Sequence, residues 1–168
     1  MTTQPAALPT TPGTGAPLLS VEDLTVEFST SAGVARALDG VSFSVAAGET
    51  LAILGESGCG KSTTAQAIMA LLPRPAGSIV GGRIMYGGRD LAAAPISKVR
   101  EVCGTEIAMI FQDPLSSLNP VKRVGTQVAE AMRRRRGVPK DAAWERALQL
   151  LKRVGIPDAE NRIKDYPH

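Results

Sequence analysis

Residues 55–62 have the types and the spacing of a loop that binds phosphate groups. They read Gly-Glu-Ser-Gly-Cys-Gly-Lys-Ser and match the pattern G-x-x-x-x-G-K-[ST]. Glycines let the main chain curl until successive N–H groups point into one hollow, where a side chain would keep a phosphate away. The ammonium group of Lys61 would neutralise the outer phosphates, and the Ser62 hydroxyl would bind Mg²⁺. The loop therefore predicts a site for a nucleoside triphosphate and Mg²⁺.

The candidate nucleotide-binding residues are this loop and the residue that follows it. They are Gly55, Glu56, Ser57, Gly58, Cys59, Gly60, Lys61, Ser62 and Thr63. The blander alternative is a glycine-rich turn with an unrelated lysine. Cys59 is by default a small loop residue, although its thiol is open to modification.

The motif needs a strand before the loop and a helix after it. The apolar run Thr50–Leu54 predicts a buried strand, and Thr63–Leu72 predicts a helix that Pro73 ends. The apolar face of this helix consists of Ala65, Ile68, Met69 and Leu72. This context favours nucleotide binding over the unrelated turn.

An antiparallel β layer is predicted before the loop. Alternating apolar residues predict a strand over 18–28, and two short strands over 34–38 and 41–45, separated by a turn at Asp39-Gly40. Phe28, at the end of the first strand, is either a core residue or a platform for an adenine base. The strand pattern alone favours the core interpretation.

The elements predicted after the first helix are less closely tied to the loop. They are a hairpin over 77–91, helices over 97–103, 124–132 and 141–155, a buried strand over 107–111, and a short segment over 159–164. Gln112 and Asp113 follow the buried strand. Either could contact Mg²⁺, or the Asp-Pro pair could simply form a turn, and spacing alone does not decide between them.

The composition is that of one globular domain, with 168 residues, 43% of them apolar, and a net charge of +3. This mild basic excess does not indicate nucleic acid, and the run 133–136 is interpreted as a solvated helix end. The single histidine, His168, is interpreted as an exposed residue without a functional role. Two cysteines without metal spacing suit a reducing compartment. Residues 1–17 are expected to be a disordered tail rather than a secretory signal.

Three stretches together resemble the ATP-binding subunits of ATP-binding-cassette (ABC) transporters. They are residues 55–63, the run Ile110-Phe111-Gln112-Asp113-Pro114-Leu115-Ser116-Ser117-Leu118-Asn119-Pro120, and Lys164-Asp165-Tyr166-Pro167-His168. The second resembles the Q-loop of importers for oligopeptides, dipeptides or nickel. The resemblance implies an α/β phosphate-loop NTPase fold with an antiparallel β-subdomain, an incomplete parallel core sheet and the start of a helical subdomain. It places a nucleotide-binding core at 18–124 and a partial helical subdomain at 125–168.

The resemblance also implies roles for individual residues. Gln112, and not Asp113, would contact Mg²⁺ and the attacking water, and Phe28 would stack on adenine. Lys61 and Gln112 would then be the catalytic residues, with Ser62 and Gln112 at the metal. The implied partners are transmembrane permease subunits, a second ATP-binding subunit and a separate solute-binding protein, at the cytoplasmic face of the membrane. Nucleic acid is not an implied partner.

The sequence departs from the family pattern after Tyr166-Pro167-His168. The family continues with Glu-Leu-Ser-Gly-Gly, a Walker B strand with its aspartate and catalytic glutamate, and a switch histidine, and none of these occurs here. We therefore expect the 168-residue chain to bind nucleotide weakly, to hydrolyse it negligibly and to be poorly stable. The rival interpretations are a GTPase or small-molecule kinase, an ABC ATPase of DNA repair, and a non-catalytic ATP-binding fragment. The guanine motif Asn-Lys-x-Asp of GTPases is absent from the sequence.

Overall fold

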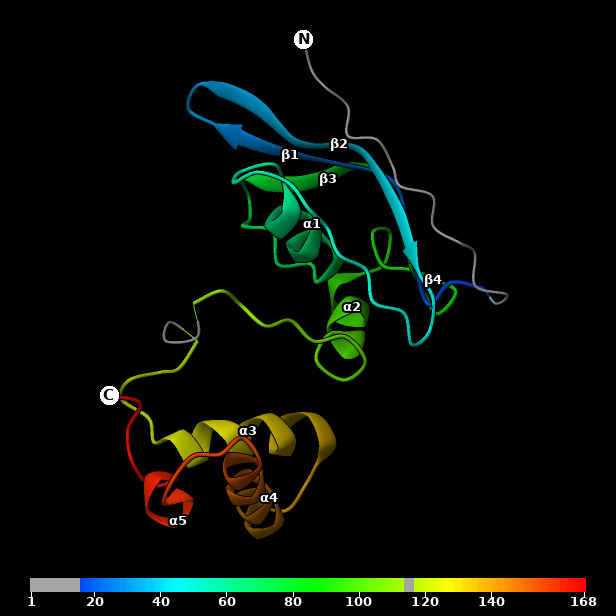
Figure 1. The fold of residues 1–168 in the computed structure, drawn as a ribbon. Coiled ribbons are helices and arrows are strands. Elements are labelled where there is room, and N and C mark those ends of the chain that lie inside the picture. The colour runs from blue at the N-terminus through cyan, green and yellow to red at the C-terminus, as the bar shows by residue number, and fades with distance from the viewer. Residues whose placement is uncertain (1–15, 114–116) are drawn as a thin grey trace. The chain divides into compact units, whose positions relative to one another are not determined.

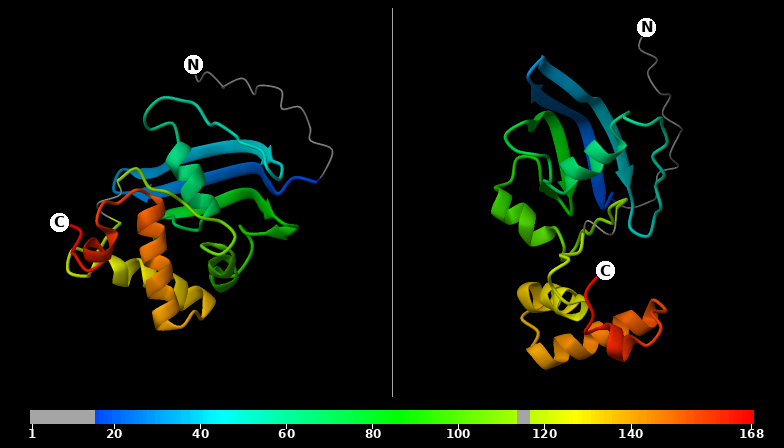
Figure 2. Two further views of the ribbon diagram at one scale, coloured as in Figure 1. Left: turned by 60° about the horizontal axis from the view of Figure 1, so that its bottom comes forward. Right: turned by 90° about the vertical axis from the view of Figure 1, so that its left-hand side faces the viewer.

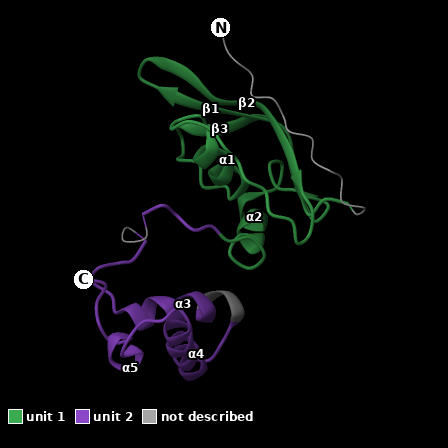
Figure 3. Ribbon diagram, in the orientation of Figure 1, with its two compact units in different colours: residues 1–108 green, residues 109–168 purple. Residues whose placement is uncertain are grey.

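The computed structural model describes residues 16–113 and 117–168, without the side chains of 134–136. It divides into two compact units, residues 1–108 and 109–168 (Figure 3). Nearly all of the tail predicted over 1–17 lies outside the described residues. So do residues 114–116 of the Q-loop-like run and most of the arginine run's side chains.

The first unit is built on a four-stranded antiparallel sheet with the order β2-β1-β3-β4 (Figure 1). The strands are β1 (Leu19–Thr30), β2 (Gly33–Val45), β3 (Gly77–Tyr86) and β4 (Arg89–Asp90). Residues of β1 and β3 form much of the core of this unit, and the fully buried ones are Val21, Leu24, Val26 and Ile84. The predicted antiparallel layer and the predicted hairpin over 77–91 are thus confirmed.

The two short strands predicted over 34–38 and 41–45 are one continuous strand, β2. The turn signal Asp39-Gly40 marks an irregularity inside that strand, where Gly40 has a φ of +68°. The pairing of β2 with β1 shifts at this point, from Leu24 with Val41 to Val26 with Leu38. A bulge can absorb such a shift without ending the strand, which explains why the turn prediction was wrong.

Helix α1 (Lys61–Ile68) lies against one face of this sheet (Figure 2). It ends at Ile68, four residues before the predicted end, and Pro73 does not terminate it. The main chain turns out of the helix through Ala70, whose φ is +52°, and the N–H of Leu71 bonds to the carbonyl oxygen of Gln66 at 2.8 Å. The buried residues of the helix are Thr64 and Ala67, while the predicted apolar face is only half-buried.

Helix α2 (Ile96–Val102) follows the hairpin and confirms the helix predicted over 97–103. Its residues Val99 and Val102 are buried in the core of the first unit, together with Cys103. Gly104, at a φ of +85°, takes the chain out of the helix, as the sequence predicted.

The two buried strands predicted over 50–54 and 107–111 are not formed. Leu54 is 87% exposed and Ile110 is 97% exposed. The second segment makes one isolated parallel bridge, from Ile107 to Cys103. A strand needs neighbouring main chain to bond its N–H and C=O groups, and no other described segment pairs with these two. Their apolar character is therefore not matched by burial in this chain.

The second unit consists of three helices (Figure 1): α3 (Val124–Arg136), α4 (Lys140–Arg153) and α5 (Ala159–Arg162). Their small core is lined by Ala129, Ala143, Ala147 and Ile163. The helices predicted over 124–132 and 141–155 are confirmed, and α3 continues through the arginine run to Gly137 at a φ of +61°. No helix in the described part of the chain is long and apolar enough to cross a bilayer.

Gly125 allows the start of α3 to lie directly against the rest of the second unit. Its N–H bonds to the carbonyl oxygen of Ile163 at 2.9 Å. A Cβ atom at this position would lie 2.6 Å from that same oxygen and 2.8 Å from Cη2 of Trp144. Both distances are shorter than van der Waals contact allows, so only glycine fits.

We expect Gly125→Ala to destabilise the second unit by about 1–3 kcal/mol, because overpacking forces neighbouring groups apart. Trp144, the single tryptophan, lies in this unit, so its fluorescence during urea unfolding measures the effect. Thr126→Ala is the matched control, since Thr126 is the next residue of α3 and is exposed. Equal unfolding midpoints for the two variants would contradict the packing argument.

Candidate functional site

The loop over 55–60 connects segment 50–54, which has no regular secondary structure, to the first residue of α1, within the first unit. Gly60, the residue before the helix, is buried and has a φ of +99°. A Cβ atom there would lie 2.6 Å from Cδ2 of Leu38 and 3.0 Å from the carbonyl oxygen of Ala37. The requirement for glycine at this position is therefore both conformational and steric, and it sets the loop directly on β2.

Thr64 fixes the same end of the loop from the helix side. Its N–H and its Oγ1 both bond to the carbonyl oxygen of Gly60, at 2.8 Å and 3.0 Å. The side chain is 4% exposed, and Thr64 is the one buried polar residue among the described residues. Thr64 is not among the site residues predicted from the sequence. The available signal was a threonine four residues after a glycine, which can bond back to that carbonyl.

Lys61 folds its side chain back over the loop. Its Nζ donates to the carbonyl oxygens of Gly55 at 2.8 Å and Glu56 at 2.6 Å, and it lies 3.5 Å from Sγ of Cys59. Its ammonium group is thus held inside the curl of the main chain. The loop itself is tightened by a turn in which the N–H of Cys59 bonds to the carbonyl oxygen of Glu56.

The first turn of α1 adds positive potential at the same place. The first bond of the helical pattern is from the N–H of Thr64 to the carbonyl of Gly60, so the preceding N–H groups have no partner within the helix. No acidic residue lies in this turn. The positive end of the helix dipole is therefore not offset locally and favours an anion beside Lys61.

These features fit a nucleotide phosphate with Mg²⁺. A Cβ atom on Gly55 would lie 2.5 Å from Sγ of Cys59, so glycine is also required at the start of the loop. Ser62 and Thr63 place hydroxyl groups in the first helical turn. Mg²⁺ is commonly held by one or two protein groups together with phosphate oxygens and water. Ser62 is the group in this turn whose position matches that role in the phosphate-loop motif.

Phe28 lies on the strand at the centre of the sheet. It pairs with Ala35 of β2 and Gly77 of β3 and is half-buried against the core. It stands two residues beyond Val26, which pairs with Leu38, the residue that Gly60 contacts. Phe28 is therefore close along the sheet to the point where the loop is attached.

Gln112 and Asp113 belong to the second unit, in the segment before α3, and both are exposed. The geometry described above thus comes from the first unit alone. Leu38 and Thr64 complete it, and neither was predicted as part of the site.

Comparison with known proteins gives a consistent result. The ABC transporter family model matches residues 38–168. The oligopeptide transport ATP-binding protein OppD of Bacillus subtilis is 48% identical over 151 residues, which cover 90% of this chain and 42% of OppD. The dipeptide transport ATP-binding protein DppD of the same organism is 47% identical, over 90% of this chain and 45% of DppD. The chain thus spans less than half the length of these relatives.

A solved structure supports the fold. The ATP-binding cassette MJ0796, described as a dimer in a post-hydrolysis state bound to ADP and Pi, superposes with a TM-score of 0.75 at 20% identity. The match covers 89% of this chain and 61% of that one. It confirms the predicted α/β fold of the ABC ATPase type.

We expect alkylation of Cys59 to weaken ATP binding by at least about tenfold, the equivalent of one charge-assisted hydrogen bond. The thiol is exposed, and a group added to Sγ would stand beside the ammonium of Lys61. Bound ATP should in turn slow the labelling by iodoacetamide.

The Cys59→Ser variant is the control for this labelling. The other cysteine, Cys103, is buried, so the variant should label slowly and should retain its affinity after treatment. Equal labelling rates of the unmodified chain with and without ATP would count against a phosphate site in this loop.

Proposed function

Because the chain belongs to the ABC transporter family, we propose that it is the nucleotide-binding part of the ATP-binding component of a peptide importer. ATP and Mg²⁺ would bind at residues 55–63. The strongest single support is the ammonium of Lys61, which is held in a glycine curl at the positive end of a helix. The likeness to OppD and DppD supports peptides as the transported class.

On this proposal the side chains divide the work. The loop N–H groups and Lys61 bind the phosphates, and the Ser62 hydroxyl ligates Mg²⁺. Phe28 offers its ring to adenine from β1. Gln112 would contact Mg²⁺ and the attacking water, a role that rests on its resemblance to the Q-loop glutamine. Bound Mg²⁺ would neutralise the charge that develops on the phosphates during transfer.

The wider assembly follows from the same proposal. The core would extend over 18–124, and residues 125–168 would begin a helical subdomain that contacts transmembrane permease subunits. The chain would pair with a second ATP-binding subunit, as the dimeric MJ0796 cassette suggests. A separate binding protein would deliver the solute, and the chain would act at the cytoplasmic face of the membrane.

Lys61→Ala should remove measurable nucleotide binding. Each charge-assisted hydrogen bond lost costs about 1.5–3 kcal/mol, which is more than tenfold in affinity. Titration calorimetry with Mg²⁺ and ATP measures the change. Lys98→Ala, which removes an exposed lysine of the same unit, should bind ATP as the unchanged chain does. Unaltered ATP affinity in the Lys61 variant would refute the proposed site.

Phosphate release distinguishes an ATPase from a non-catalytic ATP-binding fragment. We expect the 168-residue chain to bind ATP yet release phosphate no faster than its Lys61→Ala variant, since its sequence carries no Walker B or Leu-Ser-Gly-Gly segment. A phosphate-release assay at saturating ATP measures this. Turnover clearly above that variant's background would show that the chain contains a complete catalytic set.

A further inference from the structure

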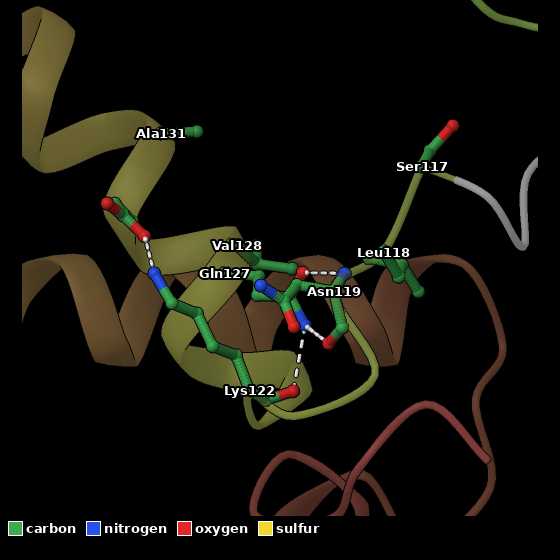
Figure 4. Close-up of a pocket in the computed structure, with 8 residues that line it drawn as sticks. Ser117, Leu118, Asn119, Lys122, Gln127, Val128 and Ala131 are labelled. Atoms are coloured by element: carbon green, nitrogen blue, oxygen red, sulfur yellow. Dashed lines mark hydrogen bonds and ion pairs between the residues drawn. The ribbon is translucent and has the colours of Figure 1, made fainter.

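The side chain of Gln127 ties the segment before α3 to the helix itself (Figure 4). Its Nε2 donates to the carbonyl oxygens of Asn119 and Lys122, at 2.9 Å and 2.8 Å. Its Oε1 accepts from the N–H of Asn119 at 2.8 Å. One amide group thus makes three bonds to the main chain of a single short segment.

The segment that Gln127 holds is also ordered internally. Oδ1 of Asn119 accepts from the N–H of Val121 at 3.0 Å, and the carbonyl of Asn119 accepts from the N–H of Lys122 at 3.2 Å. Lys122 forms an ion pair with Glu130, which lies about one turn after Gln127 on α3. The segment over 119–122 therefore has a defined shape, and it is attached to α3 by three hydrogen bonds with Gln127 and by one ion pair to Glu130.

The same turn of α3 holds a second segment of the chain. The helix has no side-chain cap at Arg123. Instead, the N–H groups of Val124 and Gly125 donate to the carbonyl oxygens of Asp165 and Ile163, each at 2.9 Å. Main chain from the end of the described sequence thus satisfies groups that a helix start leaves without internal partners.

We propose that Gln127 is a positioning residue. It fixes residues 119–122, which follow Gln112 in the sequence, on the helical turn that also holds residues 163–165. A displacement of one segment is therefore accompanied by a displacement of the other. This linkage between the two segments rests on the proposed function. Its role would be to transmit the binding of Mg²⁺ and ATP at Gln112 to residues 163–165. The held segment also forms part of the wall of an open hollow of about 440 Å³, whose shape then depends on Gln127.

Amide hydrogen exchange on the 168-residue chain, read by NMR, tests the anchoring. Gln127→Met keeps the length of the side chain and removes its amide. The N–H groups of Asn119, Val121 and Lys122 should then exchange at least about fivefold faster, the factor that one typical net hydrogen bond represents. Protection within α4 and the unfolding midpoint read from Trp144 should stay near those of the unchanged chain, which separates positioning from general stability.

Two further variants sharpen this test. Gln149→Met is the matched control, because its amide bonds only to the side chain of Arg146 among the described residues. It should leave exchange over 119–122 unaltered. Gln127→Glu keeps the acceptor for Asn119 and loses both donors, so it should loosen the segment at neutral pH. Unchanged exchange over 119–122 in Gln127→Met would overturn the proposal.

Addition of Mg²⁺ and ATP tests the linkage. In the unchanged chain, amide shifts should move both over 117–122 and over 163–165, and Gln127→Met should lose the response at 163–165 while keeping its ATP affinity. A retained response in that variant would overturn the linkage. If the unchanged chain does not bind ATP, the proposed function fails, and the exchange measurement alone still decides whether Gln127 anchors the segment.

Discussion

The constraint that organises this structure is that main-chain N–H and C=O groups must find partners. β1 finds them on both sides, from β2 and from β3, and it carries Val21, Leu24 and Val26 of the core of the first unit. The segment over 50–54 is as apolar as many strands but has no neighbour among the described residues. Ile53 and Leu54 of this segment consequently lie exposed.

The same constraint acts at the starts of the helices, where it is met in two ways. At α3 the first N–H groups are taken by carbonyl oxygens from residues 163–165, which joins distant parts of one unit. At α1 the helix starts directly after the glycine loop, and no acidic residue lies in its first turn. One helix end is therefore used for folding and the other suits a ligand.

Sequence patterns predicted the elements whose stability is local. The helices α2, α3 and α4 follow from their apolar spacing and from Gly104 and Gly137, which end two of them. The segments over 50–54 and 107–111 could not be predicted correctly. Apolar character predicts that a segment is buried, but it does not identify the neighbouring strand that the segment needs. The turn prediction at Asp39-Gly40 was wrong for a related reason, since pairing with β1 keeps β2 intact through the irregularity.

For the candidate site, spacing identified the loop, because its chemistry resides in consecutive residues. It could not identify Leu38 or Thr64, whose contributions depend on contacts made only in the folded chain. Gln127 could not be identified from the sequence for the same reason. A glutamine on a helix has no distinguishing pattern until the segment that it contacts is in place.

The two carbonyl partners of Lys61 have a thermodynamic consequence. A lysine side chain that is free in water loses up to about 2 kcal/mol of rotational freedom when it is immobilised. Here most of that freedom is already lost before any anion arrives. When an anion binds, its oxygen atoms take the place of the two carbonyl oxygens beside a lysine that is already immobilised. The loop is therefore preorganised for anion binding.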